Sequence, residues 1–83
     1  MSDRTIVYTP RGVCASRIKV VLEQDDTIKS VEFTNGCDGN HSGIAALCVG
    51  LKAEDAASRL EGITCGPRST SCPDQLAKAL RQR

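Results

Sequence analysis

Four of the five cysteines of this chain lie at predicted breaks between secondary-structure elements. Cys14 follows Arg-Gly, Cys37 follows Asn-Gly, Cys65 precedes Gly-Pro, and Cys72 precedes Pro-Asp. Cysteines that only pack behave as small hydrophobes, whereas cysteines on glycine-rich turns have backbone that can bend around a common ligand. Thiolates are soft ligands that select zinc or an iron–sulfur cluster. The sequence therefore predicts that Cys14, Cys37, Cys65 and Cys72 converge on one metal site, with zinc favoured over iron–sulfur.

The position of these cysteines, more than their spacing, carries this prediction. The intervals are 23, 28 and 7 residues, and none forms the close Cys-x-x-Cys pair of many structural zinc sites. Cys72 precedes a predicted helix, whose N-terminal N–H groups and dipole would stabilise a thiolate. His41 is a further candidate ligand, but its place in the first turn of a helix favours a surface or capping role. Cys48 falls on an apolar helical stripe and is expected to pack as a hydrophobe.

The first half of the chain predicts strands. Short strands are expected over residues 5–9, 16–24 and 28–34. The second of them alternates with period two, which places Ile18, Val20 and Leu22 on one face. A short turn at residues 25–27 predicts an antiparallel hairpin with the third strand.

The second half predicts helices. The first has apolar residues at helical spacing, Ile44, Leu47, Cys48 and Leu51. Asp38 or Asn40 is expected to cap its start, and Gly50 to mark its end. A second helix is expected over 53–61, and a third starts near Pro73 with Ser71 as its cap. Strands followed by helices indicate an α+β domain, with about three helices on one face of a small antiparallel sheet of about three strands.

The length and charge of the chain limit the classes of function that it can have. The 83 residues predict one domain, spanning 1–83, whose core contains only two aromatic residues; small domains with thin cores often add a metal or disulfides. A net charge of +1 predicts no strong attraction to nucleic acid or to an acidic membrane. No apolar run long enough to span a bilayer and no signal peptide are found, so we expect a cytoplasmic protein with reduced thiols. A single histidine, with no evident acid–base pair, argues against an enzyme acting alone.

The chain resembles the TSCPD domain family. Residues 70–74 spell Thr-Ser-Cys-Pro-Asp, and further family marks lie at Cys14, at residues 33–40 and at residues 62–66. The match covers about residues 5–80 and is to the small, stand-alone, four-cysteine members. Related domains occur at the C-termini of some ribonucleotide reductases, notably B12-dependent ones. The resemblance therefore implies an accessory module that serves a ribonucleotide reductase or another larger enzyme, without supplying a reductase active site itself.

A second resemblance is to the iron–sulfur scaffold proteins of the NifU N-terminal type. Cys14, residues 31–37, residues 44–50 and Cys72 occur in the same order as the marks of that family. Two departures are the Ala-Ser that follows Cys14, where the scaffolds have Gly-Asp, and the additional Cys65. A scaffold-like protein is thus one alternative function. The others are a thiol–disulfide redox protein that uses Cys65 and Cys72, and an interaction domain whose thiols bind no metal.

Overall fold

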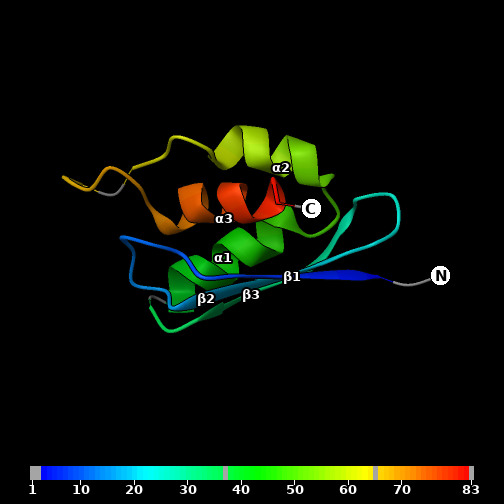
Figure 1. Cartoon of the computed structure of the whole chain (residues 1–83), viewed down its shortest axis with the longest axis horizontal. Helices are drawn as coiled ribbons and strands as arrows, with labels where there is room; N and C mark the ends of the chain where they lie inside the picture. The colour runs from blue at the N-terminus through cyan, green and yellow to red at the C-terminus, as the bar shows by residue number, and fades with distance from the viewer. Residues whose placement is uncertain (1–2, 37, 65, 83) are drawn as a thin grey trace.

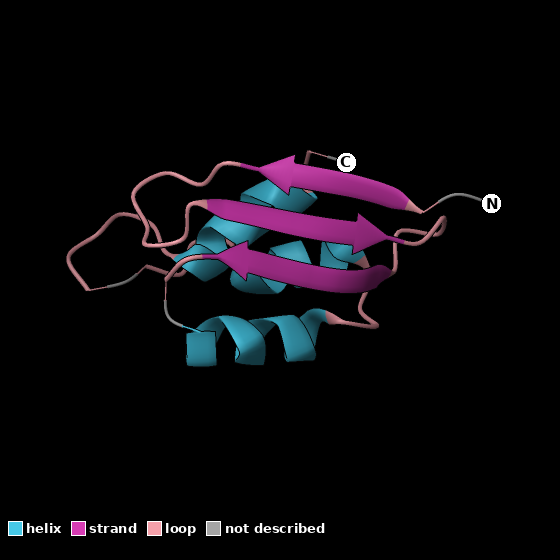
Figure 2. Cartoon of the chain, turned by 90° about the horizontal axis from the view of Figure 1, so that it is seen from below, coloured by secondary structure: helices cyan, strands magenta, loops and turns pink. Residues whose placement is uncertain are grey.

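The first half of the chain forms a three-stranded antiparallel sheet. The computed structural model describes residues 3–36, 38–64 and 66–82. Its strands are β1 (Arg4–Tyr8), β2 (Arg17–Leu22) and β3 (Ile28–Thr34), paired in the order β1-β2-β3 (Figure 2). The predicted hairpin is therefore confirmed, with β2 as the central strand.

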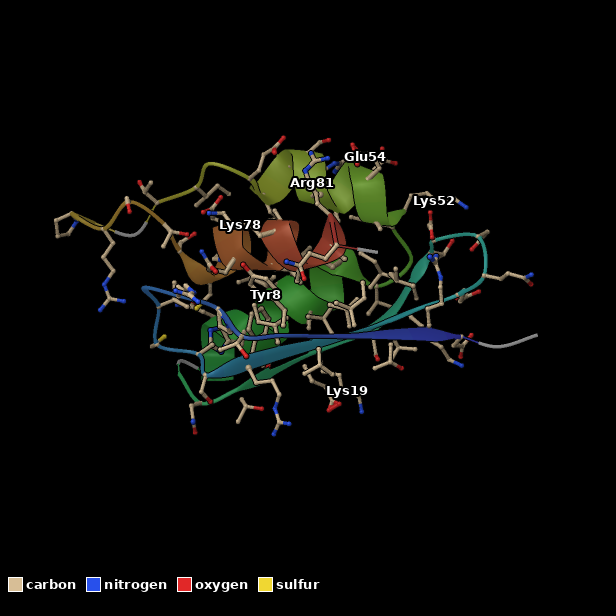
Figure 3. The ribbon with its side chains drawn as sticks, viewed as in Figure 1. Tyr8, Lys19, Lys52, Glu54, Lys78 and Arg81 are labelled. Atoms are coloured by element: carbon tan, nitrogen blue, oxygen red, sulfur yellow. The ribbon has the colours of Figure 1, made fainter. Side chains whose placement is uncertain are left out.

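Strand β2 has the period-two pattern that the sequence predicts. Ile18, Val20 and Leu22 are fully buried. The side chain of Lys19, between the first two, points away from the helices on the open face of the sheet (Figure 3). One face of the sheet is thus apolar and covered, whereas the other face is open to solvent and carries Lys19 together with its partner Val7 on β1.

The β2–β3 pairing contains an irregularity that changes which residues of β3 are buried. Val21 pairs with Ser30, whereas Leu22 pairs with Ile28, so one extra residue lies in β3 between them. Because a β-bulge offsets the alternation by one, Ile28 and Val31 both reach the core although an odd number of positions separates them.

Three helices cover the apolar face of the sheet (Figure 1). They are α1 (Asp38–Cys48), α2 (Ala53–Leu60) and α3 (Cys72–Leu80). Helix α3 contacts β1 and β2, α1 runs along β3, and α2 packs on α3 as the outermost element. This arrangement confirms the predicted α+β fold with its helices on one side of the sheet.

Small residues let α2 approach α3 closely. Ala53, Ala56 and Ala57 of α2 are buried, together with Leu76 and Leu80 of α3. At the end of α3, Arg81 lies beside α2 and pairs with Glu54 at 2.8 Å and with Glu61 at 3.0 Å (Figure 3). The outer helix is therefore fixed to α3 by apolar contact and by ion pairs at the rim.

The apolar stripe of α1 differs from the predicted one. Leu47 was expected to face inward, but its side chain is 79% exposed. The inward stripe contains His41, Ile44, Ala45 and Cys48, at i, i+3, i+4 and i+7. The prediction was wrong because it anchored the stripe on leucines and treated the histidine as a surface residue. Helix α1 also begins at Asp38, so Asp38 and Asn40 both lie within its first turn and neither is its cap.

Element ends agree with the predictions to within about two residues. The predicted strand 16–24 is shorter because Glu23 belongs to a turn, in which its N–H donates to the Thr27 carbonyl at 2.8 Å. The segment between α1 and α2 then returns to the sheet, where the Ile28 N–H donates to the Leu51 carbonyl at 2.8 Å. The connection between the helices is thereby fastened to the start of β3.

Candidate metal site

Two of the predicted ligands meet although 58 positions separate them in the sequence. Cys14 lies on the loop between β1 and β2, and Cys72 is the first residue of α3. Their Sγ atoms are 3.9 Å apart. Two thiolates on one tetrahedral zinc, with Zn–S bonds of about 2.3 Å, lie about 3.8 Å apart. This pair already has the separation that a shared zinc ion requires.

His41 joins this pair from α1. Its ring stacks on Phe33, with a centroid distance of 4.1 Å and an interplanar angle of 17°, and its side chain is only 6% exposed. The ligand atoms of Cys14, His41 and Cys72 all lie within 4.8 Å of one another. The expectation of a surface or capping role for His41 was therefore wrong. The sequence signal that identifies it is its place on the buried stripe of α1.

Gly36, just after the end of β3, brings its backbone close to His41 and Cys14. It has a positive φ of 99°, and a Cβ built on it would lie 2.6 Å from His41 Cε1 and 2.9 Å from Cys14 Sγ. Only a residue without a side chain fits there. Cys37 follows it in the sequence, but Cys37 and Cys65 lie outside the described residues, so their place in the predicted quartet remains a prediction.

The start of α3 has the predicted cap. The Ser71 hydroxyl accepts a hydrogen bond from the Asp74 N–H at 3.2 Å, and Pro73 occupies the first turn. The helix start was predicted to stabilise the Cys72 thiolate, but the pKa of this thiol is raised. Burial raises the pKa of the Cys72 thiol, the backbone N–H of Ala15 acts in the opposite direction, and the neighbouring Cys14 thiol raises it further. The net effect is a raised pKa of the Cys72 thiol, so binding a metal here displaces protons and is pH-dependent.

The cluster is open to solvent on one side. Cys14 is exposed and Cys72 partly buried. A pocket of about 380 Å³ opens beside them, between His41 and Ile44 of α1 on one side and Cys72 of α3 with its capping residue Ser71 on the other. A metal ion can therefore reach the two sulfur atoms directly from solvent.

Cys48 lies apart from this group. It is 4% exposed within the hydrophobic core, and burial raises the pKa of its thiol. The prediction that it packs as a hydrophobe is confirmed. Among the described cysteines, only Cys14 and Cys72 belong to the cluster that could hold a metal.

In the part of the chain that the structure describes, we find no helix with the length and apolar character that crossing a membrane requires. Searches of the curated proteins and of the solved structures found no match. The family model of the TSCPD domain matches residues 2–83. That match includes every predicted ligand, the Gly36 turn and the capped start of α3, and on this ground the chain belongs to the TSCPD domain family.

Proposed function

We propose that this domain binds one metal ion, zinc in preference to an iron–sulfur cluster, with Cys14 and Cys72 as ligands. The observation that carries this proposal is the 3.9 Å separation of the two Sγ atoms. Zinc suits the site because four-coordinate structural zinc sites are built from thiolates with or without histidine.

Cys37 and Cys65 are proposed to complete a set of four thiolates. Two described residues support this. Gly36, directly before Cys37, approaches both Cys14 and His41. Ile63 lies two residues before Cys65, and Ser71 lies directly before Cys72. The Ile63 carbonyl accepts a hydrogen bond from the Ser71 hydroxyl at 2.5 Å. His41 is placed to act as the fourth ligand if one of these thiolates does not bind.

Metal analysis of freshly purified protein tests the proposal. We expect about one zinc per chain, lost in Cys14→Ser and in Cys72→Ser and retained in Cys48→Ala, the matched control in the core. Comparison of His41→Gln with Cys37→Ser and Cys65→Ser then identifies the remaining ligands. Iron and sulfide, with visible absorbance, would assign an iron–sulfur cluster instead. Absence of any metal from protein with reduced thiols would refute the proposal.

We also propose that the domain is an accessory module of a larger enzyme, with a ribonucleotide reductase as the first candidate. The resemblance to domains at the C-termini of such reductases supports this. A binding titration of zinc-loaded protein against the ribonucleotide reductase of its own source tests it. Failure to bind at micromolar concentrations would remove that partner.

A thiol–disulfide role is the second candidate function. Among the described cysteines, Cys14 and Cys72 have their sulfur atoms 3.9 Å apart. The expected Cys65–Cys72 pair stays a prediction, because Cys65 lies outside the described residues. A disulfide has an S–S bond of about 2.05 Å, so the Cys14 and Cys72 sulfurs would have to approach by nearly 2 Å. A free-thiol count on metal-free protein, followed by peptide mapping, tests this role.

A further inference from the structure

The start of α3, counted from its capping residue Ser71, contains three buried polar side chains. Ser71, Asp74 and Gln75 are at most 7% exposed. Every fully buried side-chain nitrogen or oxygen among the described residues has a hydrogen-bond partner. Buried polar groups destabilise a fold unless they are paired. The partners of these three side chains therefore show what the start of α3 holds in place.

Two of these side chains hold the segment that leads to Cys65. Asp74 Oδ1 accepts a hydrogen bond from the Gly62 N–H at 2.8 Å. The Ser71 hydroxyl donates to the Ile63 carbonyl at 2.5 Å. Both contacts are to backbone atoms of consecutive residues, so they fix the path of the chain after α2.

The third side chain holds the loop that carries Cys14. Gln75 Oε1 accepts a hydrogen bond from the Arg11 N–H at 3.0 Å. Thr70 connects the two halves, because its hydroxyl donates to Asp74 Oδ2 and accepts from Gln75 Nε2 at 2.9 Å. We call Thr70, Ser71, Asp74 and Gln75 the α3 network.

We propose that Asp74 is the positioning residue of the metal site and that, through the α3 network, it holds the Cys14 loop and the Gly62–Ile63 segment against the helix that begins with Cys72 before a metal binds. This inference rests on the proposed metal-binding function. Asp74 acts through backbone contacts and through Thr70, and it is not a proposed ligand. Three of the five residues of the Thr-Ser-Cys-Pro-Asp motif, Thr70, Ser71 and Asp74, thereby belong to the network around the motif's cysteine, Cys72.

Preorganisation is the reason why such a network affects binding. Each loop residue that must be ordered when a metal binds costs conformational entropy. If the loops are already held, that cost falls on folding and not on metal binding. Groups that orient metal ligands typically change metal affinity by about 10–100-fold when mutated.

Zinc affinity, measured by competition with a chromogenic chelator, tests the proposal. Asp74→Asn keeps the size but replaces an acceptor oxygen, and we expect a loss of zinc affinity of about tenfold or more. Asp25→Asn is the matched control, since Asp25 also accepts a backbone N–H, from Thr27 at 3.1 Å, but lies in the β2–β3 turn. Its affinity should stay within about twofold of wild type.

Substitutions at Thr70 separate positioning from general stability. Thr70→Val removes the hydroxyl that joins Asp74 to Gln75 and should lower zinc affinity, whereas Thr70→Ser keeps the hydroxyl and should restore it. A network that is merely structural would lower the midpoint of unfolding in both Asp74→Asn and Thr70→Val, with zinc affinity of the folded protein unchanged. That result would overturn the proposal. Thr70→Val provides the test if Asp74→Asn does not fold.

A second readout needs no metal. In a chain that carries Cys37→Ser and Cys65→Ser, equilibration with reduced and oxidised glutathione measures how readily Cys14 and Cys72 form a disulfide, with release of two glutathione thiols per bond. Adding Asp74→Asn should lower this equilibrium constant about tenfold or more. If the wild-type chain binds no zinc but this constant falls, the proposed function fails and the positioning role stands. An unchanged constant together with unchanged zinc affinity refutes the positioning role.

Discussion

Gly36→Ala is the substitution that most directly tests the geometry of the site. Its backbone has a φ of 99°, and the added methyl group would lie 2.6 Å from His41 Cε1 and 2.9 Å from Cys14 Sγ. The His41 ring cannot easily move away, because it is buried and stacked on Phe33. The new methyl group must therefore displace either the ring, the Cys14 side chain, or the end of β3.

The expected loss of stability has two parts. Forcing an alanine into positive φ costs about 1–2 kcal/mol, and overpacking costs about 1–3 kcal/mol more. Gly50→Ala separates them, since Gly50 has a similar φ of 92° with nothing within 4 Å of an added Cβ. We therefore expect Gly36→Ala to destabilise the protein by about 1–3 kcal/mol more than Gly50→Ala does. For a domain of 83 residues with a stability of about 4–12 kcal/mol, this is a large fraction.

Urea unfolding of metal-free, reduced protein measures this difference, and chelator competition measures zinc affinity in parallel. Only Gly36→Ala should weaken zinc binding, by about 10–100-fold. Repeating Gly36→Ala in a His41→Ala background should recover part of the lost stability, because the obstructing ring is then absent. Equal destabilisation by the two glycine substitutions, with zinc affinity equal in both, would show that Gly36 does not adjoin the site.

Further predictions concern the metal, the core and the titration of Asp74. Zinc at 100 times its Kd should stabilise the folded chain by about 2.7 kcal/mol, which raises the Tm by about 10–20 °C; equal Tm values of metal-free and metal-loaded protein would mean that the site is not structural. Cys48→Ala should cost on the order of 1 kcal/mol in urea unfolding and leave zinc bound, so loss of metal would show that the wrong cysteines were chosen as ligands. Leu47→Gln should change stability by no more than about 0.5 kcal/mol, since Leu47 is exposed. A large loss of stability would show instead that Leu47 is buried in the core. Hydrogen bonds from the Thr70 hydroxyl and the Gly62 N–H lower the pKa of Asp74 below its ordinary 3.8. Its carboxylate therefore stabilises the fold above pH 3.8, and this contribution is lost as the pH falls through the lowered value. Acid titration should then narrow the stability gap between wild type and Asp74→Asn, and a gap that is constant with pH would contradict this assignment.

Local patterns determined the order and type of the elements. The alternation of Ile18, Val20 and Leu22 identifies β2 because side chains of a strand point to opposite faces in turn. Ser71 and Pro73 identify the start of α3 because a helix start needs a side-chain acceptor and tolerates proline. Such signals act within a few residues, so they can be read from the sequence directly. The family resemblance was readable for the same reason, since its motif is contiguous.

The buried face of α1 and the partners of the site were decided by tertiary structure. Leu47 and His41 exchanged their expected places because the stripe that contacts β3 is set by how the helix docks, and an apolar residue can remain exposed when the sheet offers it no surface. The bulge beside Leu22 likewise follows from pairing between strands. In both cases, the contact lies between two elements, α1 with β3 or β2 with β3, and the pattern within one element does not show it.

The sequence by itself predicted Cys14, Cys37, Cys65 and Cys72 as ligands and separated Cys48 from them, because turns and apolar helical stripes distinguish exposed thiols from packed ones. Only the folded chain placed their sulfurs 3.9 Å apart, brought His41 beside them, and tied Arg11 and Gly62 to the first turn of α3. These contacts span long stretches of chain, and their geometry is fixed by the packing of three helices on one sheet. Local sequence states which residues can do the chemistry, and tertiary packing decides which of them meet.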